Sequence, residues 1–126
     1  MNQFFDIKAA KRFQKQRHEK KQMEIDARFE KAKNDFDLIC KMIIDKYSPK
    51  RIFQWGSLLD RTRFSKISDI DIAVEGINNA QLFFNLVADA EKLTDFPLDI
   101  VPFEDIHPLH KKTILKQGKL IFENNE

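Results

Sequence analysis

Cysteine is almost absent from this chain of 126 residues: Cys40 is the only one, so no internal disulfide can form. A single cysteine in an apolar helical stretch is typical of a buried thiol in a reducing compartment, and we expect a cytoplasmic protein. No apolar run reaches the roughly 18 residues of a membrane span, and the N-terminus lacks the apolar segment of a signal peptide, so we expect neither. What is present suffices for one domain with a modest core, because 42% of the residues are hydrophobic and twelve are phenylalanine.

Neither sign of charge dominates the whole chain, whose net charge is +2, but the charges are unevenly distributed. Residues 1–21 carry a net charge of +5 and the remainder carries −3. The basic residues of this N-terminal arm are Lys8, Lys11, Arg12, Lys15, Arg17, Lys20 and Lys21. Such an arm can meet an acidic partner or nucleic acid, but a solvated helix face also explains it, and nucleic acid is not expected as a partner.

The stretch from Trp55 to Gly76 reads WGSLLDRTRFSKISDIDIAVEG and predicts a strand end, a turn, a short helix and a second strand. In the second strand, apolar residues alternate with Asp69 and Asp71, which is the period of a half-buried strand. Residues two apart in a strand share a face, so the two carboxylates point the same way. Two like charges held this close are unfavourable unless a cation lies between them, although a solvated edge strand is the ordinary alternative.

Gly56 and Ser57, just after the predicted strand 51–55, favour the cation-binding interpretation. Glycine lets a backbone approach a ligand closely. A hydroxyl and free N–H groups at a helix start suit a phosphate. Together the two features predict a site for a metal-bound phosphate compound.

Gly-Ser followed, after eleven residues, by Asp-Ile-Asp resembles the signature of the DNA polymerase β-like nucleotidyltransferase superfamily. Within it, the stretch is most similar to the minimal nucleotidyltransferases, the MNT antitoxins of HEPN/MNT toxin–antitoxin pairs. The family's third carboxylate, on a later strand, corresponds to Asp99 in Leu98-Asp99-Ile100-Val101. Where family members often carry Arg-Gly, this chain has Leu59-Asp60-Arg61, which makes Arg61 the candidate triphosphate contact, with Arg63 and Lys66 nearby.

The resemblance implies a magnesium-dependent enzyme that uses ATP. Asp69, Asp71 and Asp99 would be its catalytic and metal-binding residues, and Gly56, Ser57 and Arg61 would bind the nucleotide. The implied reaction is AMP transfer to a protein hydroxyl, a tyrosine of a cognate HEPN-type toxin, which makes the chain an antitoxin. Two alternatives stay open: a stand-alone nucleotidyltransferase for a small-molecule acceptor, and a catalytically idle antitoxin that acts by binding.

The resemblance also implies an α/β (α+β) nucleotidyltransferase core, a small mixed sheet flanked by helices. We expect this domain at residues 35–126, after an N-terminal helical extension at residues 1–34. Residues 3–20 are predicted to be helical, and from Ile25 to Ile43 apolar residues recur in steps of four and three, which is a narrow seam. We expect the part from Ile25 to Phe36 to pack on another chain, a second copy or the partner.

Local signals place the remaining elements. Ser48-Pro49 should end the long helix, and Asn78 or Asn79 should cap the next one. Residues 97–103 should form a third strand, in which Pro102 indicates either an edge of the sheet or the end of the strand. A helix that opens at His107 and stops at Gly118 should follow. His107 and His110 have the spacing of a metal pair, but cap or surface positions explain them better because no third ligand is near in sequence.

Overall fold

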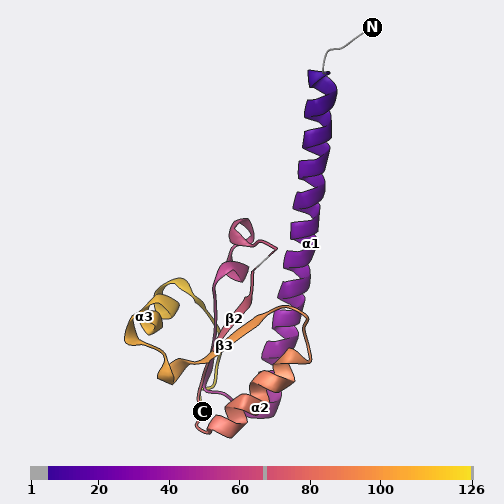
Figure 1. The fold of residues 1–126 in the computed structure, drawn as a ribbon. Coiled ribbons are helices and arrows are strands. Elements are labelled where there is room, and N and C mark those ends of the chain that lie inside the picture. The colour runs from indigo at the N-terminus through magenta and orange to yellow at the C-terminus, as the bar shows by residue number, and fades with distance from the viewer. Residues whose placement is uncertain (1–5, 67, 126) are drawn as a thin grey trace.

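The computed structural model describes residues 6–66 and 68–125. Its helices and strands in chain order are α1 (Ile7–Tyr47), β1 (Arg51–Trp55), β2 (Ile70–Glu75), α2 (Ala80–Glu91), β3 (Leu98–Pro102), α3 (Pro108–Gln117) and β4 (Lys119–Glu123). Short 3-10 turns lie at Ser57–Leu59, Arg61–Arg63 and Phe103–Asp105. The helices α1 and α2 lie on one side of the sheet and α3 lies on the other, and the N-terminal half of α1 projects far beyond the sheet (Figure 1). The predicted mixed α/β fold with a long N-terminal helix is confirmed.

Helix α1 is continuous over 41 residues and has a defined start and end. The side chain of Asp6 caps its first turn by accepting a hydrogen bond from the Ala9 N–H at 3.1 Å. Ser48 ends it in the left-handed region, with φ 49°, directly before Pro49, as predicted. Residues 3–5 of the predicted first helix lie outside the described residues.

The expectation that the seam from Ile25 to Phe36 packs on another chain is wrong. Phe29, Ala32 and Phe36 are buried in the core of this chain, and Ile25 packs against that core while partly exposed. Phe64, in the loop before β2, meets Phe29 edge-to-face with ring centroids 5.3 Å apart. The seam is narrow because both the loop before β2 and the sheet pack against it. The boundary at residue 34 stays a prediction, although core residues lie on both sides of it.

The sheet is mixed and has the order β3-β2-β1-β4. Strand β1 pairs antiparallel with β2 and β4, while β2 and β3 are parallel. The third strand is therefore an edge strand, and it also ends at Pro102, so both positions that this proline indicated are found. Leu120-Ile121-Phe122, which the sequence shows only as a short apolar piece, lies in β4, the opposite edge.

The two faces of the sheet pack against different helices. One face carries the buried residues Ile52, Ile70, Ile72 and Val74, which share a core with α1 and α2. The other face carries Phe53 and Ala73, which pack with Phe103 and with Ile114 of α3. Alternating side chains of β2 are thus buried on both faces of the sheet. On the second face, the first residue of the strand is the polar Asp71.

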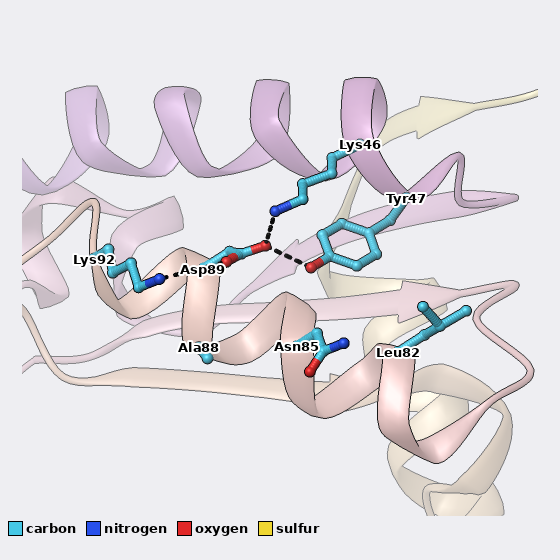
Figure 2. A pocket seen from close by; sticks show the side chains of 7 residues that line it. All are labelled: Lys46, Tyr47, Leu82, Asn85, Ala88, Asp89 and Lys92. Atoms are coloured by element: carbon cyan, nitrogen blue, oxygen red, sulfur yellow. Dashed lines mark hydrogen bonds and ion pairs between the residues drawn. The ribbon is translucent and has the colours of Figure 1, made fainter.

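Helices α1 and α2 are joined at the end of the domain where β1 begins (Figure 2). Asp89 of α2 accepts hydrogen bonds from Lys46 Nζ at 2.6 Å and from the Tyr47 hydroxyl at 2.5 Å. Burial and this hydrogen bond raise the pKa of Tyr47 to about 12. The only tyrosine of the chain is therefore committed to a structural contact.

The caps of the shorter helices agree with the sequence prediction. Asn79 caps α2 by accepting a hydrogen bond from the Leu82 N–H at 3.1 Å. His107 caps α3 by accepting one from the Leu109 N–H at its Nδ1, also at 3.1 Å, which confirms a capping role. Gly118 ends α3 as expected. None of the helices among the described residues is long and apolar enough to cross a membrane.

Candidate functional site

A row of three residues crosses the sheet at one end. Trp55 of β1 pairs with Asp71 of β2, and Asp71 pairs with Asp99 of the parallel strand β3. Residues in register on neighbouring strands share a face and stand roughly 5 Å apart, so the two aspartates are neighbours. Asp69 lies just before β2, two residues from Asp71. The predicted carboxylates, separated by up to 30 positions in sequence, therefore meet at one end of the sheet.

The pKa of Asp71 reflects its burial and its two charged neighbours. Burial, and then the nearby charges of Asp99 and Asp69, together raise the pKa of Asp71 to about 7. A carboxyl group with ordinary solvation and no charged neighbours titrates near 4. The group is thus costly to ionise in the protein alone, and a cation placed beside it would offset that cost.

Gly56 forms the wall next to Asp71. Its φ of 84° lies in the region that favours glycine, and a β-carbon built on it would be 2.0 Å from the Asp71 Oδ2 atom. No side chain fits between this backbone and the carboxylate. The glycine of the Gly-Ser turn therefore leaves room for the carboxylate itself, a requirement that the sequence pattern does not reveal.

The turn after Gly56 holds its shape through Asp60. Ser57 begins a 3-10 turn directly after the glycine, and Asp60 begins the next one. The Asp60 carboxylate accepts hydrogen bonds from the Thr62 N–H at 2.9 Å and the Thr62 hydroxyl at 2.7 Å. The predicted short helix between Leu58 and Phe64 is thus two 3-10 turns, and Ser57 stands at the start of the first.

Arg61, predicted to contact the triphosphate, lies against α1. Its guanidinium pairs with Glu30, lies 3.6 Å from Asp26 Oδ1 and stacks 4.7 Å from the centre of the Phe29 ring. These contacts fasten the turn to α1. A triphosphate contact by Arg61 stays a prediction, and it would require the side chain to leave these partners.

The donor set at the sheet end suits a hard divalent cation. Among residues 6–66 and 68–125, no three His, Cys, Asp or Glu side chains are already arranged to hold a metal ion. Asp69, Asp71 and Asp99 nevertheless offer only oxygen ligands, and burial together with the charges of Asp99 and Asp69 raises the pKa of Asp71. Carboxylate oxygens are the ligands that Mg²⁺ prefers, so the residues present fit this ion.

A family model described as "Polymerase beta, Nucleotidyltransferase" matches residues 39–126, which include all three aspartates and the Gly-Ser turn. The chain belongs to the polymerase beta nucleotidyltransferase family. No curated protein and no solved structure matches it significantly. The superfamily resemblance noted in the sequence is therefore confirmed, and the MNT subfamily is compatible with the match.

The polymerase beta nucleotidyltransferase assignment gives the chain a general role in nucleotidyl transfer. Enzymes of this superfamily generally use a nucleoside triphosphate and a divalent metal. The individual roles of Asp69, Asp71, Asp99, Gly56 and Ser57 stay predictions, now with a shared location.

Sequence reasoning missed a pocket beside Asp99. Helix α3 covers part of the same sheet face, and His110 and Thr113, both exposed, line a cavity together with Trp55 and Asp99. Their positions three apart on a helix place them on one face, which is a usable signal. That α3 lies over this end of the sheet depends on tertiary packing and has no local signal.

Proposed function

We propose that the chain is a magnesium-dependent nucleotidyltransferase that moves AMP from ATP to a protein hydroxyl. The observation that carries this proposal is the register of Asp71 with Asp99 on neighbouring parallel strands, with Asp69 two residues before. Three carboxylates at one sheet end, beside the Gly56–Ser57 turn, form a site for a metal-bound triphosphate.

In this proposal the Gly56–Ser57 turn binds the β- and γ-phosphates through backbone N–H groups and the Ser57 hydroxyl. When bound, Mg²⁺ on Asp69, Asp71 and Asp99 neutralises charge on the triphosphate. Asp99 accepts the proton of the acceptor hydroxyl, whose oxygen forms a bond to the α-phosphorus. The bond from the α-phosphorus to the bridging oxygen breaks, and pyrophosphate leaves with the electron pair.

The proposed acceptor is a tyrosine of a HEPN-type toxin, and the chain would be its antitoxin. The MNT resemblance supports this choice. The chain's own Tyr47 is a poor acceptor, because its hydroxyl is bonded to Asp89 and it precedes β1, whereas Asp71 pairs with the last residue of that strand. The tyrosine acceptor of this proposal therefore comes from another chain. A cytoplasmic location belongs to the same proposal.

The two alternatives differ in what they require of the aspartates. An idle binding antitoxin has no need of three carboxylates gathered at one end of the sheet, so the register of Asp71 with Asp99 favours an enzyme. A nucleotidyltransferase for a small-molecule acceptor needs the same aspartates, so only the identity of the acceptor distinguishes it from the proposed function.

Co-expression with a HEPN-type protein encoded beside this chain tests the proposal. We expect one adenylyl group on a tyrosine of that protein, detected by intact mass and peptide mapping, and no such group with the Asp99→Asn variant. Unmodified protein that still binds the chain would support the idle antitoxin. The absence of a HEPN-like reading frame would favour the small-molecule acceptor.

A further inference from the structure

The first half of α1 forms an arm that its own domain leaves uncovered. From Ile7 to Glu24 every residue except Ala10 is exposed, and this arm extends beyond the sheet (Figure 1). It contains seven basic and two acidic residues, and Phe13 is 64% exposed on it. A helix that projects in this way gains no stability from tertiary packing, so a second surface laid against it would stabilise it.

A groove whose chemistry is complementary to this arm lies beside the start of α2. It has a volume of about 620 Å³, and its apolar lining residues are Ile77, Ala80, Phe83, Phe84 and Pro102. Phe84 is 68% exposed although it lines the groove. Glu104 and Asp105, both exposed, also line it, and none of the described residues around it is basic. The groove therefore offers apolar surface next to negative charge, as a basic helix with an exposed phenylalanine requires.

The arm cannot reach the groove of its own chain. The groove contains Ile77, which follows β2, and Pro102, the last residue of β3. This is the end of the sheet at which β1 begins, just after α1 has ended at Tyr47. Helix α1 is continuous over 41 residues, so its first turn lies about 60 Å from that end. Any arm that occupies the groove therefore belongs to another molecule.

We propose that the arm of a second copy occupies the groove, and that two copies exchange arms in a two-fold symmetric dimer. At about 1.5 Å per residue, the arm is roughly 27 Å long, and the part of α1 from Ile25 to Tyr47 is roughly 34 Å long. When two copies lie antiparallel, each arm therefore runs along the domain of its partner and brings its tip to the end that carries the partner's groove. The exchange is reciprocal, so the assembly closes at two copies.

The contact in this dimer is a helix in an apolar groove. Phe13 enters the groove beside Phe84, and basic side chains of the arm lie next to Glu104 and Asp105. Amphipathic helices are commonly bound in this way, with apolar anchors inside the groove and charges at its rim. The dimer uses the end of the sheet away from Asp71 and Asp99, so it does not depend on the proposed function.

Light scattering after size-exclusion chromatography tests the dimer on the full chain alone, over a series of concentrations. We expect twice the mass of one chain, and a shift toward the monomer at high salt because the rim charges are screened. A chain that is monomeric at every concentration would overturn the inference and leave the groove to a different partner. A mass that keeps growing with concentration would overturn the closed, reciprocal arrangement.

Two pairs of variants separate the groove from the rest of the surface. Phe84→Ser should raise the dissociation constant of the dimer at least tenfold, whereas Leu109→Ser, at a similarly exposed position on α3, should leave it unchanged. Asp105→Lys should also weaken the dimer, whereas Glu91→Lys, exposed on α2 outside the groove, should not. Circular dichroism melting checks that all four variants fold. A dimer that is unaffected by Phe84→Ser would show that the arm binds elsewhere.

Cysteine crosslinking identifies the two surfaces that touch. Cys40, the only native cysteine, is buried, so introduced cysteines can be addressed separately. A mixture of Phe13→Cys and Phe84→Cys chains treated with a short bismaleimide should give a heterodimer joined between these two positions, as shown by peptide mapping. A mixture of Phe13→Cys and Leu109→Cys should give none. Crosslinks between two Phe13→Cys chains, without any to Phe84→Cys, would mean that the arms pack on each other and would overturn the inference.

Discussion

A β-carbon on Gly56 would lie 2.0 Å from the Oδ2 atom of Asp71, so the glycine backbone and this carboxylate occupy adjoining space. Gly56→Ala must push the carboxylate away or reshape the turn, and it also places alanine at φ 84°. We expect nucleotidyl transfer to fall about 100-fold, because losing a correctly placed carboxylate removes a few kcal/mol of transition-state stabilisation.

Gly76→Ala is the control for backbone strain. Gly76 has φ 100°, and its β-carbon would meet the Lys50 backbone nitrogen at 2.6 Å, at the other end of β2. Both variants should melt at a lower temperature than the wild type. Only Gly56→Ala should lose far more nucleotidyl-transfer activity than its loss of stability explains. Equal losses of activity in the two variants would show that Gly56 acts through stability alone.

The stability of the metal-free protein should fall as pH rises from about 4 to about 7. Asp71 has a pKa raised to about 7 in the folded chain by burial and by Asp99 and Asp69, so folding favours its protonated form. That contribution is fully present below the unfolded pKa, near 4, and is lost as pH rises through the folded value. Thermal melting in a chelator should show this slope, and Asp71→Asn should flatten it. An unchanged slope in the variant would mean that Asp71 is not the group responsible.

Ser57→Ala should weaken the binding of a non-hydrolysable ATP analogue more than it lowers stability. A hydrogen bond from a hydroxyl to a charged group contributes about 1.5–3 kcal/mol, which corresponds to an affinity loss of about tenfold or more. Calorimetric titration measures this loss, and Ser65→Ala, outside the Gly-Ser turn, is the control. Identical affinities for the wild type and Ser57→Ala would mean that the Gly-Ser turn has only a structural role.

Two N-terminal truncations should separate the projecting part of α1 from the part that belongs to the core. Deletion of residues 1–24 spares the buried Phe29 and should leave a folded chain that binds magnesium and the ATP analogue. Deletion of residues 1–36 removes Phe29, Ala32 and Phe36, and each buried phenylalanine contributes roughly 3–5 kcal/mol, so this variant should not fold.

We also expect the shorter deletion to reduce self-association or partner binding, because it removes the basic arm that projects from the domain (Figure 1). Size-exclusion chromatography with light scattering measures this. Unchanged assembly would mean that the arm is only a solvated surface. If the shorter deletion is unfolded, the whole of α1 is required for folding.

Local sequence signals predicted most elements because their causes are local. The alternation of Ile70, Ile72 and Val74 with Asp71 reports a strand with two different faces, and Pro49 ends a helix whatever surrounds it. Asp99 was found only through the resemblance, since one aspartate among apolar residues has no distinctive pattern.

The errors all involve contacts between distant segments. The narrow seam of α1 gives no sign that Phe64 covers Phe29. The contact between Arg61 and Glu30, which the sequence does not indicate either, leaves the predicted role of Arg61 untested. The pocket beside Asp99 likewise depends on where α3 packs on the sheet. Such contacts are set by the packing of the whole domain.

The transfer of label from ATP tests the central claim most directly, which is that Asp69, Asp71 and Asp99 form a nucleotidyl-transfer site. The chain, magnesium and the HEPN-type protein are incubated in parallel with ATP labelled in the α-phosphate and in the γ-phosphate. We predict that the α-label appears on the protein acceptor, that the γ-label appears in pyrophosphate, and that Asp71→Asn lowers both by about 100-fold or more while the fold survives. Control Asp95→Asn, at an exposed position before β3, should retain full activity. Label transferred from the γ-phosphate, or full activity in Asp71→Asn, would contradict the account.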